Sequence, residues 1–117
     1  MKRSRIFLIQ AVYYFITGLW PVVDIASFMK VTGPKTDIWL VKMVGLLTIA
    51  IAVTLFSAYK KSGNTIKILS ISSALAYLTI DLYYYFNGII SPVYLGDAAI
   101  EALIVLCVMF SRKSQLP

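Results

Sequence analysis

Carboxyl groups are the side chains of this 117-residue sequence best placed to do chemistry. Asp97 and Glu101 are four residues apart, so a helix would place both carboxyl groups on one face. Carboxyl groups held close together share protons or bind cations, because mutual repulsion opposes full ionisation of all of them. The sequence therefore predicts a site for a proton or a small ligand. Such a pair also suits acid/base catalysis, but no nucleophile motif, phosphate-binding loop or metal-ligand spacing accompanies it, so an enzyme is the less favoured alternative.

The predicted site combines acidic residues with one lysine and two tyrosines. Asp37 is left out because its position before an apolar stretch predicts only a helix cap. We expect Lys42 to form an ion pair with Asp81 or Asp97, and Glu101, the deepest carboxyl, to stay protonated. The predicted ligand-binding and proton-binding residues are Asp24, Lys42, Tyr77, Asp81, Tyr84, Asp97 and Glu101.

Composition excludes several other kinds of site. Histidine is absent and Cys107 is the single cysteine, so the sequence predicts no metal site, no internal disulfide and no cofactor. The net charge is +6, but the basic residues form short clusters between apolar runs and no basic stripe carries aromatic residues. We therefore predict no nucleic-acid partner.

Four apolar stretches must position these side chains. They cover residues 6–23, 38–59, 66–86 and 92–110, and each is close to the about 20 residues that a helix needs to cross a membrane. Hydrophobic residues make up 60% of the chain, more than a soluble domain of this size can bury. The predicted fold is an all-α integral membrane protein, an antiparallel four-transmembrane-helix bundle, with residues 1–117 forming a single domain. The segment between the first two stretches is predicted to be a loop with a Gly-Pro turn.

The distribution of lysine and arginine predicts the orientation of these helices. Eight basic residues fall on one predicted side: Lys2, Arg3, Arg5, Lys60, Lys61, Lys67, Arg112 and Lys113. The opposite side has only Lys30, Lys35 and Lys42. Because basic residues concentrate in cytoplasmic segments, we predict a multi-pass protein of the bacterial inner (plasma) membrane with cytoplasmic N and C termini.

Depth along the helices brings the charged residues into one layer. At about 1.5 Å per residue, Lys42, Asp81 and Asp97 lie about 7–9 Å below the outer boundary. Glu101 lies one turn deeper, and Asp24 lies at the rim. Facing lipid, a charged group costs about 2.5–3.5 kcal/mol or more, so these groups should face the bundle interior. The result is a predicted acidic pocket open to the outer face, which narrows toward the apolar cytoplasmic half.

Aromatic residues cluster near the same predicted boundary: Trp20, Trp39, Tyr83, Tyr84, Tyr85 and Tyr94. Amphipathic rings favour the membrane interface, so an aromatic belt explains them. Walls of a ligand pocket are the second explanation, and the sequence leaves both open.

Two functions fit these features. The first is a binding or transport protein that accepts a small cationic or lipophilic ligand, with proton uptake or release coupled to occupancy. The alternative is a structural accessory subunit of a membrane complex, in which the polar residues only hold helices together. Expected partners are the lipid bilayer, the ligand or proton, and a second copy of the chain or a membrane partner subunit.

The sequence also resembles the DoxX-like group of small four-helix bacterial membrane proteins. The similar features are a basic residue before the first helix, the Gly18-x-x-Pro21 pattern, Lys42 with Gly45 in the second helix, and Glu101 early in the fourth. The resemblance implies a four-helix membrane architecture. Some members of that group are linked to redox or sulfur metabolism as accessory membrane subunits.

Overall fold

The computed structural model describes residues 2–60 and 63–111 and contains five α-helices in these ranges. They are α1 (Arg3–Val23), α2 (Ile25–Thr32), α3 (Ile38–Ala58), α4 (Asn64–Phe86) and α5 (Val93–Met109). The prediction of an all-helical protein is confirmed. The four predicted apolar stretches correspond to α1, α3, α4 and α5, with ends that differ from the predicted ones by up to three residues.

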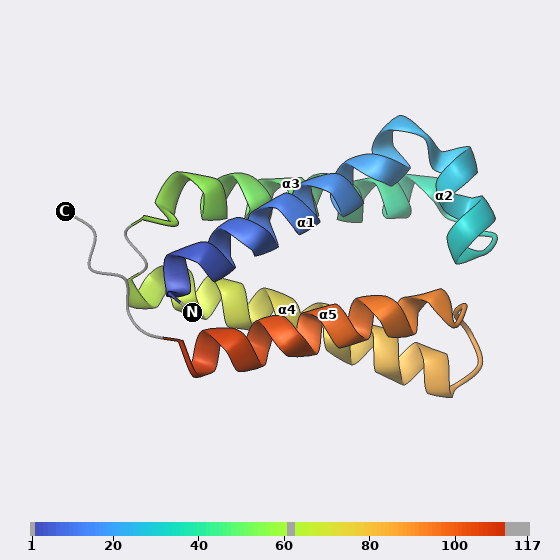
Figure 1. Ribbon diagram of the computed structural model, residues 1–117. Helices are drawn as coiled ribbons and strands as arrows, with labels where there is room; N and C mark the ends of the chain where they lie inside the picture. The colour runs from blue at the N-terminus through green and yellow to red at the C-terminus, as the bar shows by residue number, and fades with distance from the viewer. Residues whose placement is uncertain (1, 61–62, 112–117) are drawn as a thin grey trace.

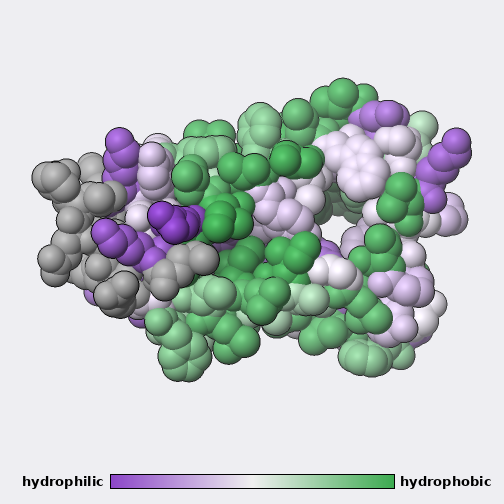
Figure 2. Space-filling model, in the orientation of Figure 1, coloured by the Kyte–Doolittle hydropathy of each residue, from purple (hydrophilic) through white to green (hydrophobic). Residues whose placement is uncertain are grey.

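Three of these helices, α1, α3 and α4, are long and apolar enough to cross a membrane. Helix α5, with 17 residues, is not among them. Many large apolar side chains on the long helices are exposed, and Figure 2 shows hydrophobic residues spread over much of the surface. Apolar side chains in such numbers on the outside of a small protein indicate a lipid environment, so these spans mark the chain as a membrane protein.

The long helices lie in two pairs (Figure 1). Helix α1 packs against α3, and α4 packs against α5, while contacts between the pairs are much fewer. Helix α1 begins where α5 ends, and Arg3 Nε donates to Ser111 Oγ at 3.1 Å there. We call this the terminal end of the molecule, and the opposite end, which carries α2, the α2 end. The pairs lie close together at the terminal end and farther apart toward the α2 end (Figure 1).

Two glycines bring the backbones of α1 and α3 into contact. A Cβ atom added to Gly18 would lie 2.7 Å from the carbonyl oxygen of Gly45, and one added to Gly45 would lie 2.6 Å from the carbonyl oxygen of Gly18. Small residues allow membrane helices to approach this closely, since no aqueous hydrophobic effect drives them together. The close contact explains why α1 and α3 form a tight pair.

An apolar cluster fills the molecule between the pairs toward the terminal end. Its buried members include Phe7 from α1, Leu55 from α3, and Ile104 and Val108 from α5. These side chains close the interior on that side. Apart from the buried polar pair of Gln10 and Ser70, the described interior toward the terminal end is therefore mostly apolar, as the sequence of the fourth stretch predicts.

The segment between the first two long helices is partly helical, so its prediction as a loop is wrong. Helix α1, which contains Pro21, ends at Val23. Asp24 follows, and its carboxylate accepts a hydrogen bond from the backbone N–H of Ser27 at 3.2 Å. This N-cap starts a second helix, which ends before Gly33, a glycine with a φ of 104°. The sequence contains this capping residue, but the helix was not predicted because the segment is short.

Candidate functional site

A cavity of about 440 Å³ lies between the two helix pairs toward the α2 end. All five helices contribute to its wall, and Figure 2 shows the hollow between the upper and lower halves of the molecule. The cavity exists because the pairs touch through few residues and separate away from the apolar cluster. Three carboxyl groups line it, those of Asp81, Asp97 and Glu101.

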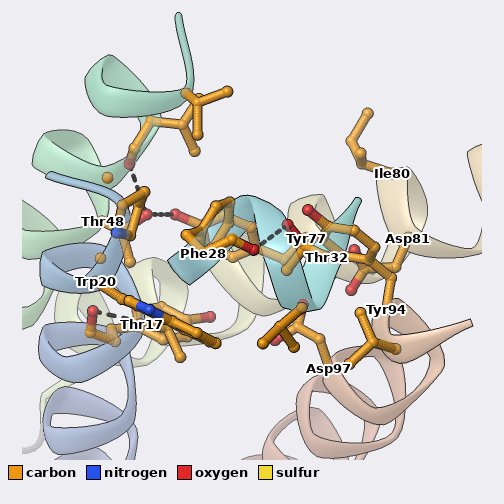
Figure 3. A pocket seen from close by; sticks show the side chains of 18 of the residues that line it. Thr17, Trp20, Phe28, Thr32, Thr48, Tyr77, Ile80, Asp81, Tyr94 and Asp97 are labelled. Carbon is orange, nitrogen blue, oxygen red and sulfur yellow. Dashed lines mark hydrogen bonds between the residues drawn. The ribbon is translucent and has the colours of Figure 1, made fainter. Parts of the chain in front are cut away.

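Asp81 is the carboxyl group with an unused acceptor. It projects from α4 and its side chain is only 5% exposed. Its Oδ2 atom is buried and has no hydrogen-bond partner among the described residues. Figure 3 shows Asp81 and Asp97 on facing helices, with their carboxyl groups directed into the space between them. A buried acceptor of this kind is costly to leave unpaired, so it favours either a proton shared with the neighbouring Asp97 carboxyl or a hydrogen-bond donor from outside the chain.

Two tyrosines of α1 hold the carboxyl groups of α5. The Tyr14 hydroxyl donates to Glu101 Oε1 at 2.7 Å, and both side chains are 1% exposed. The Tyr13 hydroxyl donates to Asp97 Oδ1. Adjacent residues of α1 therefore each bind a carboxyl group of α5, and the two carboxyl groups lie one helical turn apart. These bonds link the two helix pairs across the cavity floor.

Two further sets of polar contacts lie near the bonds between the tyrosines and the carboxyl groups. Gln10 Nε2 donates to the carbonyl oxygen of Ser70 at 3.1 Å, and Ser70 Oγ donates to Gln10 Oε1. Both of these side chains are fully buried. On the other side, the hydroxyls of Thr48 and Tyr77 are hydrogen-bonded, which links α3 to α4 (Figure 3). The Tyr77 ring packs edge-on against the Tyr14 ring, with centroids 5.3 Å apart.

Helix α2 and the segment after it form the rim of the cavity. Trp20 Nε1 donates to Ser27 Oγ at 2.7 Å, and the Trp20 ring packs edge-on against Phe28. Lys35 Nζ donates to the carbonyl oxygens of Thr32 and Gly33 at 3.2 and 3.3 Å. The same ammonium group lies 5.3 Å from the centre of the Tyr94 ring, a cation–π contact between this segment and α5.

The structure brings together four of the seven predicted site residues. Tyr77, Asp81, Asp97 and Glu101 all line the cavity. They converge because α4 and α5 are paired and present these side chains toward α1 and α3.

The other three predicted residues, Asp24, Lys42 and Tyr84, do not line the cavity. Asp24 is exposed and caps α2. Tyr84 is 39% exposed and packs against Tyr83 at the surface. Lys42 does not line the cavity, and among the described residues it forms no ion pair with Asp81 or Asp97. Depth along the helices does not specify which way a side chain faces, and that is why these three residues were predicted together with the others. Asp37 is at the N-cap position of α3, as expected, but its side chain makes no capping hydrogen bond.

Sequence reasoning missed two contributors to the cavity. Lys35 lies on the rim, and α2 covers one side, because the segment before α3 folds back over the opening. The sequence signal for α2 was Asp24, a residue type favoured at helix N-caps, directly before Ile25. No sequence signal marked Thr48 as the partner of Tyr77. Of the aromatic residues, Trp20 and Tyr94 line the cavity, whereas Trp39 is 64% exposed. The aromatic belt stays a prediction.

The arrangement suits proton and cation binding. Within residues 2–60 and 63–111, no group of three Asp, Glu, Cys or His side chains is positioned to hold a metal ion. The geometry and burial define a helical membrane protein with an acidic internal cavity. No protein-family model, curated protein or solved structure matches the chain. The resemblance to the DoxX-like group stays a prediction.

Proposed function

We propose that α5 is a fourth membrane span and that the four long helices form an antiparallel bundle in the plasma membrane, with both termini in the cytoplasm. The distribution of charge supports this. The basic residues Lys2, Arg3, Arg5 and Lys60 are at the terminal end. Lys61, Arg112 and Lys113, which the prediction also used, lie outside the described residues. All five acidic residues are at or toward the α2 end, which in this orientation faces outward.

Reporter fusions test this orientation. A reporter that is active only in the cytoplasm should work when fused to either end of the chain, and a reporter that requires export should work at neither. Fusing both reporters after Gly33, between α2 and α3, supplies the control, because the pattern should be reversed there. An inactive cytoplasmic reporter at the C terminus would show an odd number of spans.

We further propose that the protein binds a small cationic or lipophilic ligand in the outward-facing cavity, with proton exchange coupled to binding. One observation carries the proposal: three carboxyl groups line a cavity that is large enough for a small molecule, and one of them, Asp81, has a buried oxygen without a hydrogen-bond donor in the described part of the chain. A structural site would be expected to pair its buried acceptors within the chain.

Charge balance supports the coupling to protons. Three carboxyl groups face the cavity, and one ammonium group, that of Lys35, lies on its rim. Repulsion among close carboxylates is relieved by a proton or by a bound cation, so an entering cation would displace a proton. The other titratable side chains that line the cavity with Asp81 are Tyr13, Tyr14, Lys35, Tyr77, Tyr94, Asp97 and Glu101.

A structural accessory subunit is the second candidate. The tyrosine–carboxyl pairs favour it, because the bonds of Tyr13 to Asp97 and Tyr14 to Glu101 hold α1 to α5. Polar contacts of this kind fix helix register in membrane proteins without binding any ligand. In this function the cavity would be an incidental result of loose packing between the helix pairs.

Ligand titration separates the two candidates. Purified protein in lipid nanodiscs would be titrated with naphthylmethylamine and with its neutral analogue naphthalenemethanol between pH 5 and pH 8. The binding function predicts saturable binding of at least one probe. Release of one proton per bound cation would strengthen amine binding by up to about tenfold per pH unit as the pH rises. Asp81→Asn and Glu101→Gln should remove that pH dependence. An accessory subunit predicts that neither probe binds and that the substitutions change only thermal stability.

A further inference from the structure

Most of the cavity wall is apolar, which restricts the chemistry of an occupant. Trp20, Phe28, Val44 and Ile80 are among the side chains that line it. A small inorganic cation would lose its hydration shell there without gaining a cage of oxygen ligands. An organic molecule gains from the same wall, because its apolar part leaves water. The wall therefore favours a ligand with a substantial hydrocarbon part.

Among the three carboxyl groups of the cavity, Asp81 has a buried oxygen that no N–H or O–H group of the described residues reaches. Tyr13 already donates to Asp97, and Tyr14 already donates to Glu101. Oδ2 of Asp81 receives no hydrogen bond from the described residues. The three carboxyl groups are therefore not equivalent: Asp97 and Glu101 each accept from a tyrosine, whereas the neighbour of Asp81 is the carboxyl group of Asp97, with which it can share a proton.

Lys35 does not supply a donor to Oδ2 of Asp81. Its ammonium group is bound to the carbonyl oxygens of Thr32 and Gly33 and lies over the ring of Tyr94. These contacts keep the only ammonium group among the cavity-lining residues at the rim, where it cannot serve as a donor to Asp81. A group from outside the chain with a positive charge and an N–H donor would pair this oxygen and balance the charge of the neighbouring carboxyl groups together.

We infer that the cavity binds a protonated amine with an aromatic or aliphatic body, whose ammonium group donates a hydrogen bond to Oδ2 of Asp81. This inference rests on the proposed binding function and specifies its ligand class. The body of the amine lies between the apolar side chains of α1, α3 and α4, and the Tyr77 ring forms part of that wall. Charge-assisted hydrogen bonds are the stronger kind, and exclusion of water from a buried site strengthens them further.

Three probes that share one ring system test the inference on the unmodified protein. Naphthylmethylamine has both charge and N–H donors, naphthylmethyltrimethylammonium has charge without N–H donors, and naphthalenemethanol is neutral. Binding would be measured by equilibrium dialysis against nanodiscs at pH 7, with empty nanodiscs as the blank for partition into lipid. The amine should bind about ten- to a hundredfold more tightly than either of the other probes, which is what a hydrogen bond to a charged group contributes.

The remaining outcomes overturn the inference in distinguishable ways. Equal affinity of the amine and the trimethylammonium probe would show that charge alone is recognised. Equal affinity of the amine and the alcohol would show a lipophilic site without ionic recognition. In both cases the proposed binding function would stand and the ligand class would be wrong. Binding of none of the three probes would reject both proposals.

Substitution of Asp81 tests whether this residue binds the ammonium group of the probe. Asp81→Asn should lower the affinity for the amine to that of the alcohol and leave the affinity for the alcohol unchanged. Asp24→Asn is the matched control, because Asp24 is exposed on α2 and asparagine can also serve as an N-cap. An unchanged preference for the amine in folded Asp81→Asn would assign the ammonium group to another residue. If Asp81→Asn does not fold, the comparison of the three probes on the unmodified protein decides.

Discussion

Gly18 is one of two residues at which a single added methyl group would disturb the packing of α1 on α3. A Cβ at this position would lie 2.7 Å from the Gly45 carbonyl oxygen, whereas ordinary contacts begin at 3.4 Å. The helices must separate by the difference, about 0.7 Å, to accept alanine. Overpacking of this kind costs about 1–3 kcal/mol. Helix propensity acts in the opposite direction, since alanine is favoured over glycine by up to about 1 kcal/mol.

Gly96→Ala isolates the cost of the clash. Gly96 also lies within a helix, but a Cβ there would meet nothing within 4 Å. This substitution therefore carries the propensity gain without the clash. Reversible unfolding in mixed detergent micelles should show Gly18→Ala to be less stable than Gly96→Ala by about 1–3 kcal/mol.

The double variant Gly18→Ala/Gly45→Ala gives a second check. One separation of α1 from α3 relieves both clashes, so the double variant should lose less stability than the sum of the two single variants. Equal stability of Gly18→Ala and Gly96→Ala would refute the close backbone contact. Strict additivity in the double variant would show that the two glycines do not face each other.

Three further substitutions test the other contacts. Tyr14→Phe should lower the free energy of unfolding by about 1–3 kcal/mol, because it leaves Glu101 buried without its donor, and the loss should be much smaller in a Glu101→Leu background. Ser70→Ala should cost a similar amount, because it removes the donor to the buried Oε1 of Gln10. Adding Gln10→Leu should restore most of the stability in the same unfolding assay. Asp24→Ala should cost about 1 kcal/mol and speed hydrogen exchange in the first turn of α2 alone; faster exchange across α1 and α3 would contradict its role as a local cap.

The sequence was informative about the long helices because hydropathy and length are properties of continuous segments. Each predicted stretch matches a helix, and the acidic residues fall toward one end of the molecule, as depth along the helices predicts. Asp81, Asp97 and Glu101 also meet in the cavity. Their helices must turn these side chains away from lipid, and that requirement can be derived without knowing how the helices are paired.

The positively charged residue near the carboxyl groups was harder to predict. Lys42 was expected to be the counterion of the carboxyl groups, but Lys35 lies at the cavity instead. The reason is that Lys35 follows α2, a helix whose position depends on packing of Phe28 against Trp20. Such a contact between neighbouring elements has no counterpart in periodicity or composition.

By itself, the sequence determined that the chain is helical, that at least three segments can enter a membrane, and that its carboxyl groups are concentrated toward one end. These features follow from apolar surface and from the cost of placing charge in lipid, which each segment experiences separately. Only the tertiary structure decided that Tyr13 and Tyr14 each donate to a carboxyl group of α5, while an oxygen of Asp81 receives no hydrogen bond from residues 2–60 and 63–111. The pairing of α1 with α3 and of α4 with α5 sets which side chains meet across the interior, and that choice depends on contacts between residues far apart in the chain.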